Sequence, residues 1–188
     1  MYSIFLFLHI VGALGIFAGL AIEQAALFTL RHAGSNAQVR EWLSLLRVIP
    51  RFVVPSALVL LVTGIYMMAT RWSHQTWAGL GLVGMVLIAA IGELVTGRRM
   101  KPIGQAIFTG GQGDSLPAAL RDRLADPALR LSAWVRLGLV LGLVFNMSVK
   151  PGTGGAVAAL IVAATLGLLA AQIGGGLSRS MRRPAVQE

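Results

Sequence analysis

Cysteine is absent from the sequence, and charged residues are scarce. Without cysteine the chain has no disulfide, no thiolate metal site and no C-x-x-C-H attachment for c-type haem, so a bound haem would have to be non-covalent. Charged residues make up 12% of the 188 residues, and hydrophobic residues make up 56%. A soluble domain carries about a quarter charged residues. We therefore expect one membrane domain, residues 1–188, because no polar stretch is long enough to bury a core of its own.

Acidic residues are scarcer still, with seven Asp and Glu against 16 Lys and Arg, for a net charge of +9. In a soluble protein this excess would suggest nucleic acid, but here the basic residues lie beside apolar runs, as membrane topology requires. We expect the lipid bilayer, and no nucleic acid, as a partner.

No phosphate loop, nucleophile and base pair or paired carboxylates stand out, so a hydrolase has no support and whether the protein is an enzyme stays open.

Long apolar runs dominate what is present. The first, residues 3–30, is long enough at about 1.5 Å per helical residue to cross the roughly 30 Å hydrocarbon core of a bilayer. Asp126 followed by Pro127 is a typical N-cap and first-turn pair for the fourth run, and three glycines beginning at Gly174 are expected to end the fifth. The pattern predicts an all-α membrane helix bundle with five transmembrane helices, at about residues 3–30, 52–69, 77–97, 129–148 and 156–174.

Two connecting segments carry further signals. From about residue 37 to 49, apolar residues recur at helical spacing, which predicts a short amphipathic helix lying in the membrane interface. The longest polar segment, about 98–128, is expected to be a cytoplasmic loop with a short helix from Ser115.

The distribution of basic residues predicts the orientation. With five spans the termini lie on opposite sides, and an outside N-terminus leaves on the inner side every Lys and Arg except Arg71, Lys150 and the intramembrane Arg136. We therefore expect the N-terminus out and the C-terminus in, in a multi-pass protein of the bacterial inner (plasma) membrane.

Three charged residues fall well inside the predicted spans, away from their ends. Counting depth from the span boundaries places Glu23 and Arg136 roughly 10 Å, and Glu93 roughly 6 Å, inside the cytoplasmic edge. An intramembrane charge is costly, so contact of Arg136 with Glu23 and Glu93 inside the bundle is the natural hypothesis. Such a layer could serve as a proton or cation path. The alternatives are a structural pair, or an Arg136 side chain that extends to the headgroups.

A chemically different layer falls in the outer half of the predicted bundle. It holds imidazole and thioether side chains, with one further histidine in the adjacent loop: His9, Met67, Met68, Met85, Met147 and His74. These groups are ligands for Cu(I), and His or His/Met pairs hold haem iron. His9 is the first candidate to bind haem b or copper, with Met67, Met85, Met147 and His74 as further metal ligands. The alternatives are methionines that only fill apolar space and a His9 that only hydrogen-bonds a neighbouring helix.

Small residues line one face of the first span. Gly12, Gly15, Gly19 and Ala26 lie three, four and seven residues apart, which lets another helix approach closely. Glycine-rich faces of this kind also allow a homo-oligomer.

Two short stretches resemble known membrane proteins. The stretch FLFLHIVGA, residues 5–13, resembles the leucine-histidine opening of the first span in copper-resistance D-like membrane proteins. The stretch FNMSVKPG, residues 145–152, is similar to the Met-x-x-Lys-Pro signature of a related, uncharacterised group of bacterial integral-membrane proteins. The resemblance implies an association of His9 with haem or copper. The tryptophan usual in the family a few residues further on is replaced by Gly15 and Ile16.

The pattern as a whole predicts a bacterial inner-membrane protein that binds a non-covalent haem or copper near its periplasmic face. One alternative is a small-solute or proton carrier that uses the layer of Glu23, Glu93 and Arg136. The other is a structural membrane subunit packed by its glycine faces.

Overall fold

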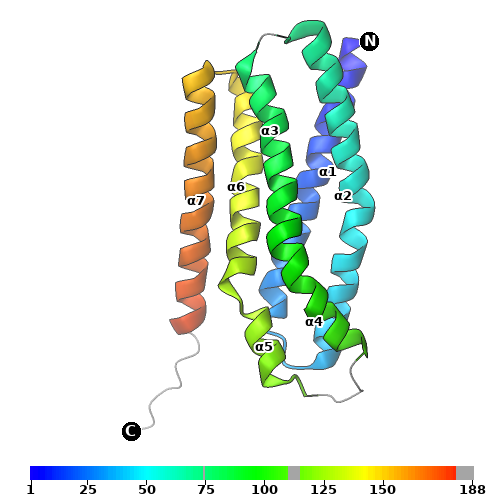
Figure 1. The fold of residues 1–188 in the computed structure, drawn as a ribbon, viewed down its shortest axis with the longest axis vertical. Coiled ribbons are helices and arrows are strands. Elements are labelled where there is room, and N and C mark those ends of the chain that lie inside the picture. Colours follow the sequence, from blue (N-terminus) through cyan, green and yellow to red (C-terminus); the bar gives the residue numbers. More distant parts are fainter. Residues whose placement is uncertain (74, 110–114, 181–188) are drawn as a thin grey trace.

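The computed structural model describes residues 1–73, 75–109 and 115–180, and the regular elements within them are all helices (Figure 1). The elements are α1 Tyr2–Leu30, α2 Asn36–Arg71, α3 Thr76–Ile91, the π-helix η1 Gly92–Gly97, α4 Arg98–Thr109, α5 Ala118–Leu124, α6 Pro127–Val149 and α7 Thr153–Ser180. Five helical stretches are long and apolar enough to cross a membrane. The predicted all-α fold with five membrane spans is therefore confirmed.

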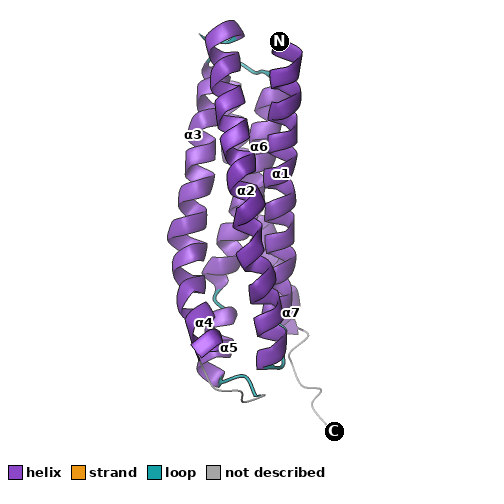
Figure 2. Ribbon diagram, turned by 90° about the vertical axis from the view of Figure 1, so that its right-hand side faces the viewer, coloured by secondary structure: helices purple, strands orange, loops and turns teal. Residues whose placement is uncertain are grey.

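The long helices run side by side along one axis (Figure 2). Helix α7 packs on α6, α6 contacts α3 and α1, and α1 packs along α2. One end of the bundle holds the N-terminus and the connections from α2 to α3 and from α6 to α7, and we name it the Trp72 end after the residue that caps α2 (Figure 1). The opposite end holds α4 and α5 and is named the α5 end (Figure 1).

The small face of α1 packs against α2 of the same chain. A Cβ added at Gly12 would lie 2.9 Å from the carbonyl oxygen of Ser56, so the two backbones are too close for a side chain there. Gly15 and Gly19 face the same helix, at Ser56 and Val53. The expected close approach of a second helix is confirmed. A homo-oligomer stays a prediction, and this face of α1 is not free to form it.

The prediction of a separate interfacial helix at 37–49 is wrong. The segment is helical, but it is the first part of α2, which continues through Pro50 and Pro55 to Arg71. Val39 and Leu43 are buried in a core at the α5 end instead of facing headgroups. That core joins apolar residues from the first half of the chain to α4, α5 and the start of α6: Leu27, Leu30, Ala33, Val39, Leu43, Ile103, Ile107, Leu116, Leu120, Leu124 and Ala133.

The expected cytoplasmic loop at about 98–128 is also largely helical. After α3, the chain continues through η1 into α4 without a break, because α4 has its own apolar face, with Ile103 and Ile107 buried. The short helix expected from Ser115 begins at Ala118. Residues 110–114 lie outside the described part of the chain.

The last two spans differ little from the expectation. The Asp126 side chain accepts a hydrogen bond of 2.8 Å from the backbone N–H of Ala128, which confirms the predicted N-cap of α6. The candidate membrane span in α7, Thr153–Gly174, ends at the expected residue, but the helix itself continues to Ser180, so the glycines at 174–176 do not end it. Glycine inside a helix costs about 1 kcal/mol against alanine, which weakens a helix without ending it.

Candidate functional site

A pocket of about 300 Å³ opens between α1, α2, α3 and α6 near the Trp72 end. Its lining includes His9 of α1 together with four methionines from three other helices: Met67, Met68, Met85 and Met147. The structure thus brings together the described members of the predicted outer layer. His74, the remaining member, lies outside the described residues.

His9 is buried and bonded to α2. Its Nδ1 atom lies 3.0 Å from the hydroxyl oxygen of Thr63, and that hydroxyl donates to the carbonyl of Val59 at 2.6 Å. A hydroxyl has a single hydrogen, so when Thr63 donates it to Val59, Thr63 can only accept from His9. The proton of a neutral His9 is then on Nδ1, and the lone pair is on Nε2. The expected hydrogen bond from His9 to a neighbouring helix is confirmed, and it leaves one ring nitrogen able to bind a metal.

Two glycines make room in the pocket. A Cβ added at Gly64 would lie 3.2 Å from Cε1 of His9, and one added at Gly81 would lie 2.7 Å from the terminal methyl of Met147. Larger residues at these positions would push the imidazole or the thioether out of place. Sequence reasoning missed both glycines, since glycine is frequent throughout the spans and neither lies on the small face of α1.

Aromatic rings and a cation surround the mouth of the pocket. The ring centroids of Trp72 and Trp77 are 5.3 Å apart, and the indole N–H of Trp72 donates to the hydroxyl of Tyr2 at 3.4 Å. The ammonium of Lys150 lies 4.3 Å from the centroid of the Trp72 ring. All four residues line the pocket. In the sequence Lys150 is a topology signal and the lysine of the Met-x-x-Lys-Pro stretch, and neither predicts a place in a pocket.

The second predicted group centres on Arg136, which is only 5% exposed. Both carboxylate oxygens of Glu23 accept hydrogen bonds from the guanidinium, one of them at 3.1 Å from Nη1. Arg136 also donates to the hydroxyl of Thr96 at 3.2 Å and to the carbonyl of Ser132 at 3.4 Å. The predicted contact of Arg136 with Glu23 is present, and the arginine does not extend to the headgroups.

The predicted contact of Arg136 with Glu93 is wrong. The Glu93 side chain is 65% exposed and forms an ion pair of 2.6 Å with Lys101. The physical reason is η1, because a π-helix has more residues per turn than an α-helix and so turns Glu93 away from the face that carries Thr96. Gly92 lies against the guanidinium instead, and a Cβ there would be 3.0 Å from Nη1. The sequence analysis did not include Thr96 in this network. Its polar hydroxyl inside an apolar run was the signal that could have indicated a buried hydrogen bond.

The donor set limits which metals fit. Among the described residues, no group of three or more His, Cys, Asp or Glu is arranged to hold a metal ion. The pocket offers one imidazole and several thioethers instead, which suit Cu(I) or haem iron better than Mg²⁺, Ca²⁺ or a structural Zn²⁺.

Comparisons of the chain with protein-family models, with curated proteins and with solved structures find no match. The resemblance to the copper-resistance D-like proteins therefore stays a prediction that rests on its two short stretches.

Proposed function

We propose that the protein binds a non-covalent haem of the b type in the pocket, and that His9 would hold its iron. The observation that carries the proposal is the hydrogen bond from His9 to Thr63, which directs the lone pair to Nε2 in a residue that lines the pocket. Histidines that bind metals commonly donate their other ring N–H to an oxygen in this way, which fixes the ring and its tautomer.

The size and lining of the pocket support an organic ligand. Its volume of about 300 Å³ is at the lower end of the range for small-molecule pockets, about 300–1,000 Å³, and is larger than a single coordinated ion needs. The lining also offers thioethers, from Met67, Met85 and Met147, and one of them would hold the iron together with His9, since His/Met pairs hold haem iron. Bound haem would supply one-electron chemistry, while the apolar side chains would keep water from the iron.

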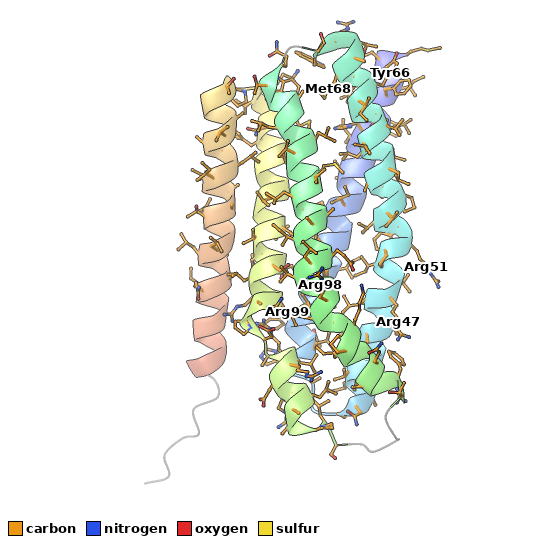
Figure 3. The ribbon with its side chains drawn as sticks, in the orientation of Figure 1. Arg47, Arg51, Tyr66, Met68, Arg98 and Arg99 are labelled. Carbon is orange, nitrogen blue, oxygen red and sulfur yellow. The ribbon has the colours of Figure 1, made fainter. Side chains whose placement is uncertain are left out.

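The charge distribution supports the proposed orientation. Arg47, Arg51, Arg98 and Arg99 lie toward the α5 end, whereas Tyr66 and Met68 lie near the Trp72 end (Figure 3). By the positive-inside rule the α5 end faces the cytoplasm of a bacterial inner membrane, and the pocket is near the outer face.

A visible spectrum of protein purified from its native membrane in mild detergent tests the proposal. We expect a Soret band in the parent, its loss in His9→Ala, and its retention in His32→Ala. His32 is a matched control because it is an exposed histidine that bonds the carbonyl of Phe28 at the opposite end of α1. A parent without a Soret band, or a band of equal strength in His9→Ala, would refute haem binding.

Copper(I) is the second candidate, and the four methionines in the lining favour it. Copper analysis of the same preparations separates the two candidates. Copper in a parent that has no Soret band, together with loss of that copper in His9→Ala, would assign the pocket to the ion. The carrier and the structural subunit make no use of the pocket, and they predict neither haem nor copper.

A further inference from the structure

Lys150 holds an unfavourable backbone conformation at the mouth of the pocket. Its φ of 53° and ψ of 52° are left-handed, and among the described residues it alone has a positive φ without being glycine. The left-handed region is unfavourable for a side chain with a Cβ, and glycine is the usual residue at this position after a helix. The following Pro151 further restricts the backbone of Lys150. Strained residues of this kind are concentrated at functional sites.

The ammonium of Lys150 lies close to two aromatic rings. The Nζ atom lies 4.3 Å from the ring centroid of Trp72 and 6.0 Å from that of Trp77. Both tryptophans and Lys150 line the pocket that contains His9. The charge is thus directed toward the pocket by two rings that belong to its wall.

No carboxylate among the described residues pairs with Lys150. Glu23 pairs with Arg136, Glu93 with Lys101, and Asp126 with Arg99. The other described acids, Glu41 in the first part of α2 and Asp122 in α5, are on elements of the α5 end. A cation that faces an apolar pocket without a protein counter-charge is suited to an anionic ligand.

We propose that Lys150 binds the acidic group of the ligand in the pocket. The ligand then has an apolar body that reaches toward His9 and a carboxylate end at the membrane surface. This inference rests on the proposed haem site, in which the carboxylates are the propionates of the porphyrin. A phosphate of an anionic lipid offers the same charge, and the test separates the two sources.

The test measures the preference of the protein for a porphyrin acid over its ester. Full-length protein freed of bound ligand, in phosphatidylcholine nanodiscs, is titrated with iron-free protoporphyrin IX and with its dimethyl ester. Quenching of tryptophan fluorescence reports binding, because Trp72 and Trp77 line the pocket. Without iron, ligation by His9 contributes nothing to the affinity. We expect the parent to bind the acid roughly tenfold more tightly than the ester, the size of one charged hydrogen bond.

Three variants define the role of the ammonium. Lys150→Met should abolish the preference, and Lys150→Arg should keep it. Lys101→Met is the matched control, because Lys101 also precedes a proline but lies in α4 at the opposite end. It should behave as the parent, and a detergent melt of each variant checks that it is folded.

Three results would overturn the proposal. The first is equal binding of acid and ester by the parent, and the second is an undiminished preference in folded Lys150→Met. The third is loss of the preference in phosphatidylglycerol nanodiscs, which would assign Lys150 to lipid headgroups. If His9-dependent haem binding persists in any of these cases, only the role of Lys150 fails. If neither porphyrin binds and no Soret band is present, the haem site fails as well.

Discussion

Removal of Arg136 is expected to destabilise the bundle strongly. In Arg136→Leu, Glu23 loses the partner of both its carboxylate oxygens, although its side chain is only 13% exposed. Breaking a buried pair by removing one partner costs about 3–5 kcal/mol. We therefore expect the free energy of unfolding to fall by about 3 kcal/mol.

The measurement is the free energy of unfolding in mixed micelles, by titration with a denaturing detergent. Arg99→Leu is the matched control, because it removes the ion pair of 2.8 Å with Asp126, in which the Arg99 side chain is 43% exposed. Exposed pairs contribute at most about 1 kcal/mol. The double variant Glu23→Leu/Arg136→Leu should lose less than Arg136→Leu, since no charge is left unpaired. A parent-like stability of Arg136→Leu would refute the reasoning.

Three further predictions concern the packing, Glu93 and the topology. Gly12→Ala should lower the free energy of unfolding by about 1–3 kcal/mol, because its Cβ meets the α2 backbone. Gly79→Ala is the control and should raise the free energy of unfolding slightly, because nothing lies within 4 Å of its Cβ. A parent-like stability of Gly12→Ala would contradict the close packing. Glu93→Gln should change the free energy of unfolding by less than about 1 kcal/mol, since it breaks only an exposed pair, and a larger loss would place Glu93 in the buried network after all. Single cysteines at Ser73 and Ser115 should react differently with an impermeant thiol reagent on intact cells, and labelling at Ser115 but not at Ser73 would invert the proposed orientation.

The five spans and the Arg136 pair could be predicted from the sequence, because both follow from the cost of placing polar groups in lipid. Length and apolarity identify each span, and an arginine in mid-span needs a carboxylate at its own depth, which Glu23 provides. Depth counting also placed His9 beside the methionines that line the pocket.

The errors have one cause in common, which is that a one-dimensional pattern does not identify the neighbour of a residue. An apolar stripe such as Val39 and Leu43 fits a lipid surface as well as it fits α4 and α5, and only the fold decides between them. Glu93 has the right depth to meet Arg136, but the π-helix changes the direction of its side chain. No pattern in the sequence predicts that π-helix. Lys150 was missed because a charge beside a span has a topological explanation that conceals a second role.

The unbroken α2 helix has a consequence for the order in which the protein is assembled. At about 1.5 Å per residue its 36 residues extend about 54 Å, so one end must project beyond a hydrocarbon core of about 30 Å. The core that contains Val39 also contains Ile103, Ile107 and Leu120, which leave the ribosome more than 60 residues later. During that interval, with the α5 end in the cytoplasm as proposed, the membrane surface is the nearest apolar phase for this stripe. We therefore expect the stripe to rest on the membrane surface, as the predicted interfacial helix would, until α4 and α5 are made and cover it.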